Sequence, residues 1–152
     1  MDLVAGDLRE ILLAISIEDV DGLAGARHLD AHLSLGAGLD PGWLDQFSVA
    51  VRTATGVGEP TDFSAACWPL DGPGDVGERT VERVDSAWVE AVARVTDREL
   101  DAVAGCWIEL LGRTLGSLDA DDKPAIRELA ARLVAFTRAA EGSPAVVFAW
   151  SI

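Results

Sequence analysis

The most regular hydrophobic pattern lies in the last third of the chain. Six apolar residues recur there at intervals of one, three or four: Leu100, Val103, Ala104, Trp107, Leu110 and Leu111. This spacing places them on one face of an α-helix. Thr96 and Glu99 stand before them in the order of a capping box, in which each side chain satisfies the other residue's backbone N–H. The pattern predicts a helix from about residue 97 to 112, ending near Gly112 or Gly116.

A second amphipathic helix is predicted to follow, beginning near Asp121 and Asp122 with Pro124 in its first turn. Gly142 and Pro144 supply its stop signal. Its buried stripe consists of Ile126, Leu129, Ala130, Leu133, Phe136 and Ala140.

Two earlier helix starts share one pattern, an Asp followed three positions later by a Trp. They are Asp40 with Trp43 and Asp85 with Trp88. Because Asp is a favourable N-cap, these positions predict helices over about 41–55 and 86–95.

Strand signals are shorter. Residues 145–152 are rich in β-branched and aromatic side chains and follow a turn signal, which predicts a buried C-terminal strand. Two segments are candidates for its partners. Residues 11–17 are continuously apolar, and fit either a strand or the end of an amphipathic helix that starts near Val4. Residues 26–35 alternate apolar and polar positions, which favours a strand, although a helix stays open.

An irregular segment over 56–77 contains five glycines and three prolines. Its middle is too apolar for a free linker, since Phe63, Cys67, Trp68 and Leu70 lie there. We expect a loop packed on the core, with a short strand near 63–68. Neither flanking half carries enough apolar residues for a core of its own. Residues 1–152 are therefore expected to form a single α+β domain, with about five or six helices and a small sheet that includes the C-terminal strand.

The charge is strongly negative: 26 Asp and Glu against 12 Lys and Arg give a formal net charge of −14. A surface this acidic should repel nucleic acids and anionic membranes, so neither is an expected partner. No apolar run approaches the roughly 20 residues that span a bilayer. With no secretory signal and two unpaired cysteines, a cytoplasmic location is expected. The absence of Asn and Tyr, with a single Lys, favours a GC-rich bacterial genome.

One cluster resembles a ligand set. On a strand, His28, Asp30, His32 and Ser34 would project from one face; on a helix, His28 and His32 would lie one turn apart, a workable metal spacing. The cluster could form an acid–base or divalent-metal site, but a solvated strand face carries polar residues by default. The sequence contains no motif for a phosphate-binding loop, for the nucleophile elbow of hydrolases or for a calcium-binding loop. No cofactor is predicted.

Trp68 differs from the other four tryptophans, which fall at positions typical of core packing. It precedes Pro69 in the irregular segment, where an aromatic side chain could serve a partner. The leading hypothesis is a non-catalytic interaction or small-ligand-binding protein with a contact surface around Phe63, Trp68 and Leu70. The partner could be a protein, a small molecule or a second copy in a homodimer. The alternative is a small metal-dependent or acid–base enzyme that uses His28, Asp30 and His32.

Overall fold

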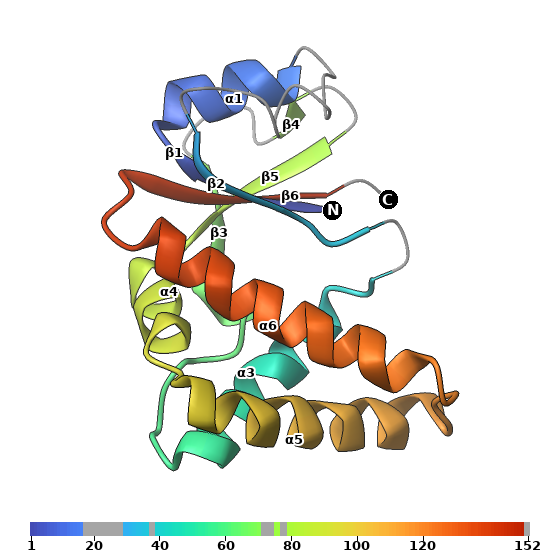
Figure 1. Ribbon diagram of the computed structural model, residues 1–152. Helices are drawn as coiled ribbons and strands as arrows, with labels where there is room; N and C mark the ends of the chain where they lie inside the picture. Colours follow the sequence, from blue (N-terminus) through green and yellow to red (C-terminus); the bar gives the residue numbers. More distant parts are fainter. Residues whose placement is uncertain (17–28, 37–38, 71–74, 77–78, 151–152) are drawn as a thin grey trace.

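The protein has an α+β fold, with helices on both faces of one antiparallel sheet (Figure 1). The structure is a computed structural model that describes residues 1–16, 29–36, 39–70, 75–76 and 79–150. Within these ranges, helices contain more residues than strands. One helix, α1 (Leu8–Ser16), covers one face of the sheet. The other face carries α3 (Gly42–Thr55), α4 (Ser86–Ala93), α5 (Asp97–Leu115) and α6 (Asp122–Ala140).

The sheet has the strand order β2-β1-β6-β5-β3, and β4 pairs with the outer edge of β5. All the pairings are antiparallel. The strands are β1 (Asp2–Gly6), β2 (Leu29–Ser34), β3 (Cys67–Pro69), β4 (Asp75–Val76), β5 (Arg79–Val84) and β6 (Ala145–Trp150).

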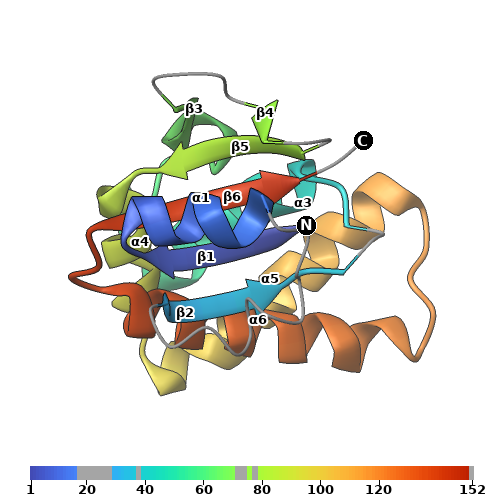
Figure 2. The ribbon, with the colours of Figure 1, turned by 90° about the horizontal axis from the view of Figure 1, so that it is seen from above.

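Alternation along the strands divides the apolar side chains between two cores. Val4, Val81 and Val147 face α1 and pack with its Ile11 and Ile15. Their neighbours in sequence, such as Leu3 and Phe148, point to the opposite face and join the larger core. Figure 2 shows α1 lying over the centre of the sheet. Because β1 and β6 are central strands covered on both faces, they carry apolar residues at successive positions rather than at alternate ones, apart from Asp2 at the start of β1.

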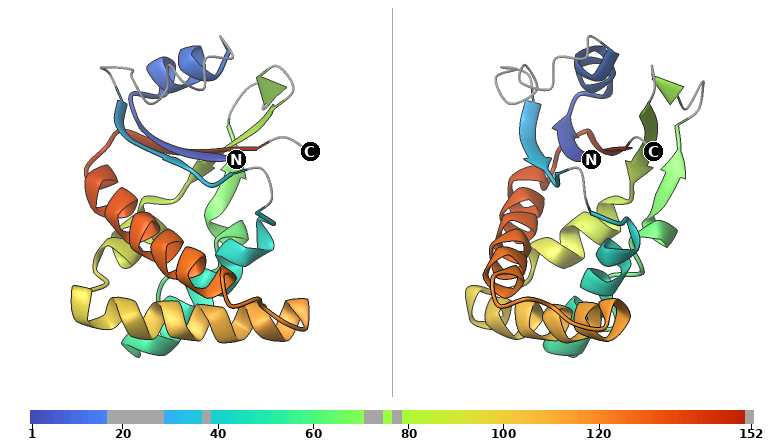
Figure 3. Two further views of the ribbon diagram at one scale, coloured as in Figure 1. Left: turned by 45° about the vertical axis from the view of Figure 1, so that its right-hand side comes forward. Right: turned by 90° about the vertical axis from the view of Figure 1, so that its right-hand side faces the viewer.

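The larger core fills the space between the sheet and the four remaining helices. Its largest fully buried side chains include Trp88, Trp107, Phe47 and Phe63. Phe63 contacts the rings of both Trp88 and Phe148 edge to face. Helix α6 packs against β2 and against α5, and Figure 3 shows α6 between the sheet and α5.

The helices predicted from periodicity are confirmed. Helix α5 runs through Gly112 and ends before Gly116, whose φ of 83° suits glycine at a helix end. Helix α4 stops at Ala93, two residues earlier than expected. The C-terminal strand is also confirmed. The short strand expected near 63–68 is present as β3, at Cys67–Pro69, and a 3₁₀ turn over Ser64–Ala66 occupies most of the expected range before it.

The two segments left open between helix and strand are resolved differently. The 11–17 run is helical through Ser16 and belongs to α1, whereas Ile17 lies outside the described residues. The helix begins at Leu8, because Val4 belongs to the unexpected strand β1. The 26–35 segment forms β2 over its described part, and 26–28 are outside it.

Candidate functional site

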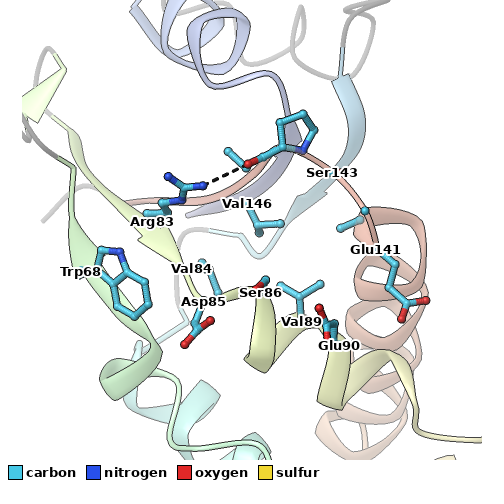
Figure 4. A pocket seen from close by; sticks show the side chains of 14 residues that line it. Trp68, Arg83, Val84, Asp85, Ser86, Val89, Glu90, Glu141, Ser143 and Val146 are labelled. Atoms are coloured by element: carbon cyan, nitrogen blue, oxygen red, sulfur yellow. Dashed lines mark hydrogen bonds between the residues drawn. The ribbon is translucent and has the colours of Figure 1, made fainter.

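A cavity of about 260 Å³ lies at one corner of the sheet, where β5 leads into α4 and α6 leads into β6 (Figure 4). We call it the Trp68 pocket. Four segments contribute to its lining: Trp68 of β3, Arg83 to Ser86 at the β5–α4 junction, Val89 and Glu90 of α4, and residues 140–146 at the α6–β6 turn. Since these segments are far apart in sequence, the pocket exists only in the folded chain.

Trp68 forms one side of the pocket, and Figure 4 shows its indole standing free of the other labelled side chains. It is 43% exposed, whereas Trp88 and Trp107 are fully buried. Trp68 lies on β3, an edge strand, opposite Arg83 of β5. Because burying an aromatic side chain removes a large apolar area from water, an exposed indole at a cavity is a natural anchor for a partner.

The base of the pocket is apolar, and its rim is mostly acidic. Val84, Val89 and Val146 are buried and supply aliphatic surface. The carboxylates of Asp85, Glu90 and Glu141 lie around this surface, as Figure 4 shows. A partner group would therefore meet an aromatic side, an aliphatic base and three carboxylates.

Arg83 is the one cation among the lining residues, and it is already engaged. Its Nη2 donates a hydrogen bond to the carbonyl oxygen of Pro144 at 3.2 Å. This bond joins β5 to the turn before β6 along one edge of the pocket (Figure 4). Against three carboxylates, one guanidinium leaves the lining with two net negative formal charges. Outside the lining, Arg94 lies 3.7 Å from the exposed carboxylate of Glu90.

The N-terminus of α4 also opens toward the pocket, but three of its first four backbone N–H donors, those of Ala87, Trp88 and Val89, are occupied. Asp85 is the N-cap, and its Oδ1 accepts from the backbone N–H of Ala87 at 2.9 Å. The carbonyl oxygen of Asp85 accepts from the backbone N–H groups of Trp88 and Val89. A carboxylate thus already holds the position at which a helix would otherwise attract an anion.

The sequence-predicted contact residues do not share one surface. Phe63 is only 2% exposed and packs inside the core against Trp88 and Phe148. Leu70 is half-buried against the cluster under α1 and does not line the pocket. Of the three, Trp68 alone lies at the cavity, in company with residues of α4 and the α6–β6 turn that the sequence did not single out.

The polar cluster on β2 is also divided. His28 lies outside the described residues. Asp30 is exposed, and its Oδ2 accepts a hydrogen bond from the hydroxyl of Ser143 at 2.7 Å. His32 instead contacts Asp2, with 3.1 Å between Nε2 and Oδ1. Asp30 and His32 therefore interact with different parts of the fold.

Asp2 is the centre of a small ionic cluster that sequence reasoning missed. Its carboxylate is buried between His32 and Arg79, whose Nη1 lies 3.3 Å from Oδ2. Burial alone would raise the pKa of Asp2. The hydrogen bond with His32, the amino-terminal charge and a hydrogen bond from Ser34 outweigh burial and leave the pKa below its usual range.

Metal and thiol chemistry receive little support from the described residues. Within those ranges, no group of three or more His, Cys, Asp and Glu side chains is placed to hold a metal ion. Cys67 and Cys106 are free and half-buried. Burial, reinforced by Glu82 and Asp45, raises the pKa of the Cys67 thiol to about 12. This thiol is therefore protonated at neutral pH and a poor nucleophile.

A second cavity, of about 250 Å³, lies between the end of α5, the first half of α6 and the start of α3. Its lining is mostly apolar and includes Trp43, Leu115, Ile126 and Leu129. Its lining also contains Trp107, which is fully buried, and one charged residue, Asp122, so it lacks the exposed indole and the three carboxylates of the Trp68 pocket.

None of the described helices is long and apolar enough to cross a membrane. Comparison with known proteins finds no matching protein family, no matching curated protein and no matching solved structure.

Proposed function

We propose that this protein is a non-catalytic binding protein that holds its partner through the Trp68 pocket. The observation that carries the proposal is the exposed indole of Trp68 beside a cavity of about 260 Å³. Tryptophan is among the residues that contribute most to binding energy at interfaces, particularly where it fills or borders a pocket.

The size of the pocket favours a single chemical group over a cofactor. Pockets for drug-sized ligands and cofactors measure roughly 300–1,000 Å³ and enclose most of the ligand. The Trp68 pocket is below this range. One side chain of a partner, or a small molecule of similar size, is the occupant that it suits.

The pocket is also supported from behind, which favours a preorganised site. Val84 and Val89 lie beside the aromatic cluster of Phe63, Trp88 and Phe148. The Arg83–Pro144 hydrogen bond ties the α6–β6 turn, which lines another part of the pocket, to β5. A site whose framework is already ordered loses less entropy when a partner binds.

The enzyme alternative has weaker support. It requires His28, Asp30 and His32 to act together, but Asp30 binds Ser143 and His32 binds Asp2. No observation on the described residues gives these side chains a shared substrate cavity, so we do not propose this second function.

Titration of the ¹⁵N-labelled chain, followed by NMR, tests the proposal. The probes are capped tripeptides, acetyl-Gly-Xaa-Gly-amide, in which Xaa is Arg, Lys, Glu, Leu or Trp. At least one probe should shift the Trp68 indole signal saturably, together with signals of Val89 and Ser143. The Trp68→Ala variant should keep a folded spectrum and lose these shifts.

Leu13→Ala is the matched control, because Leu13 is 58% exposed on α1 and does not line the pocket. This variant should bind as the unmodified protein does. The proposal fails if no probe reaches the Trp68 signal, or if folded Trp68→Ala binds the probes unchanged.

A further inference from the structure

Resting on the proposed function, we infer that the Trp68 pocket accepts the guanidinium group of an arginine side chain presented by a basic protein partner. Three features of the pocket select this group: the exposed indole, the acidic rim and the occupied N-terminus of α4. The acidity of the whole chain selects the kind of partner.

The indole favours a planar cation. A guanidinium stacked on a tryptophan face is attracted by the negative face of the ring, and its flat shape makes wide contact with the ring. An ammonium group is more compact and more strongly hydrated, so it gains less from the same surface. Arginine is therefore preferred over lysine.

The rim supplies the matching charge. Glu90 and Glu141 lie on the side of the cavity away from Trp68, and Asp85 lies between Trp68 and α4, as seen in Figure 4. A guanidinium entering between the indole and these carboxylates finds acceptors in Glu141, in the second carboxylate oxygen of Asp85 and in Glu90, which Arg94 contacts only at 3.7 Å. The aliphatic base formed by Val84, Val89 and Val146 suits the methylene stem of the same side chain.

An anion is disfavoured at the same place. Arg83 and the start of α4 could in principle attract one, but the Arg83 guanidinium already binds the Pro144 carbonyl and the α4 cap is the Asp85 carboxylate. An incoming carboxylate or phosphate would instead meet the three acidic residues of the rim. Electrostatics therefore selects against it.

A protein partner follows from the charge of the whole chain. With a formal net charge of −14, this protein attracts positively charged macromolecules over distances longer than a single contact. The pocket would then hold one arginine of the partner, and the surrounding acidic surface would guide the approach. In this arrangement the pocket supplies the specific contact, and the acidic surface supplies the long-range attraction.

The experiment compares two capped tripeptides, acetyl-Gly-Arg-Gly-amide and acetyl-Gly-citrulline-Gly-amide. Citrulline has nearly the shape of arginine but no charge. We expect the arginine peptide to bind at least about fivefold more tightly, measured on the Trp68 indole signal. The lysine peptide should fall between them, and the glutamate peptide should not shift this signal.

Two double variants then separate the rim from the general charge. Glu90→Gln/Glu141→Gln should weaken binding of the arginine peptide about three- to tenfold and leave the citrulline peptide unchanged. Glu10→Gln/Glu109→Gln removes the same charge from exposed positions outside the pocket and should have little effect.

The outcomes distinguish this inference from the proposed function. If the citrulline, leucine or glutamate peptide binds at Trp68 as well as the arginine peptide does, the cation inference is overturned and the pocket remains a binding site. If both double variants weaken arginine binding equally, the selection comes from net charge and the inference also fails. If no peptide shifts the Trp68 signal, both proposals fail together.

Discussion

Ser48 and Trp88 form a side-chain hydrogen bond inside the larger core. The indole Nε1 of Trp88 donates to the Ser48 hydroxyl at 2.9 Å, and that hydroxyl donates to the carbonyl of Leu44. Both residues are buried, so neither polar group has water as an alternative partner. This contact matters for the pocket, because Trp88 and Val89 of α4 are neighbours in sequence.

Ser48→Ala should lower the free energy of unfolding by about 1–3 kcal/mol, because it leaves the Trp88 indole N–H buried without an acceptor. Urea denaturation followed by tryptophan fluorescence measures the change. Thr53→Ala is the control: Thr53 lies on the same helix and donates to Val49 in the same way, but it is exposed. It should change stability by less than about 0.5 kcal/mol. Equal effects of the two substitutions would show that the Trp88 contact contributes nothing.

Asp2 gives the fold a defined sensitivity to acid. Since its folded-state pKa is below that of the unfolded chain, its contribution to stability is present above the unfolded pKa. The contribution disappears as the pH falls below about 4 and through the folded pKa. The same carboxylate holds Arg79 and His32, so its protonation weakens both contacts.

Asp2→Asn should therefore cost about 1–3 kcal/mol at pH 7 and should reduce the loss of stability on acidification. Urea denaturation at a series of pH values from 7 to 3 measures both effects. Asp101→Asn, at an almost fully exposed position, should leave the pH profile as it is. A profile that Asp2→Asn does not alter would contradict the role assigned to the buried carboxylate.

The environment of some single residues could be predicted from the sequence, and that of others could not. The exposure of Trp68 could be anticipated, because it precedes Pro69 in a segment without helical or strand periodicity. The burial of Phe63 could not be anticipated, since an aromatic residue in such a segment can point inward or outward. The Asp2–His32 contact depends on the pairing of β1 with β2, and no local pattern connects residues 30 positions apart.

At the scale of elements, Arg138 of α6 links three segments near the α4–α5 junction. Its guanidinium binds the carbonyls of Ala93 and Val95 and lies 3.0 Å from the Asp97 carboxylate. These bonds connect the C-terminal end of α4 to the start of α5. They also hold α4 against α6, the two helices between which part of the Trp68 pocket lies.

Arg138→Met should keep the apolar stem and lower the free energy of unfolding by about 1–2 kcal/mol, since two carbonyls lose a charged donor. Arg113→Met is the comparison, because among the described residues the ion pair of Arg113 is a long, exposed contact with Glu109. It should change stability by less than about 0.5 kcal/mol. Thermal or urea denaturation that ranks the two substitutions in the opposite order would refute the linking role.

Helices could be predicted from the sequence because their apolar faces repeat over many residues, whereas several of the strands are too short or too polar to show such a pattern. Helices α3, α5 and α6 repeat an apolar face over about four to five turns and begin or end at recognisable residues. Strand β1 has five residues, all of them buried, and resembles the start of a helix. Strand β5 is largely polar, with Val81 and Val84 as its buried residues, because it lies near the sheet edge.

The candidate pocket was beyond prediction for a related reason. Its rim combines Asp85, Glu90 and Glu141, which in sequence are ordinary polar residues of a helix start, a helix surface and a turn. Only the packing of β3, α4 and the α6–β6 turn brings them to the same cavity. The sequence singled out Trp68 and the acidic composition of the chain, but it did not show that Trp68 and these three carboxylates line the same cavity.

At the scale of the whole molecule, the net charge of −14 creates repulsion between acidic groups that folding brings closer together. Salt screens this repulsion over distances of about 10 Å at 0.1 M ionic strength. The urea midpoint should therefore rise as NaCl is increased from 0.02 to 0.3 M. A midpoint that falls over this range would mean that attractive ion pairs such as Arg138–Asp97 outweigh the repulsion.

The most direct test of the central claim is the titration of the ¹⁵N-labelled protein with acetyl-Gly-Arg-Gly-amide, read on the indole signal of Trp68. A Trp68→Phe variant identifies that signal among the five tryptophans. The proposed binding site predicts a saturable shift that includes Val89 and Ser143 and that folded Trp68→Ala does not show. A Trp68 signal that stays in place with this peptide and with every other probe would contradict the account.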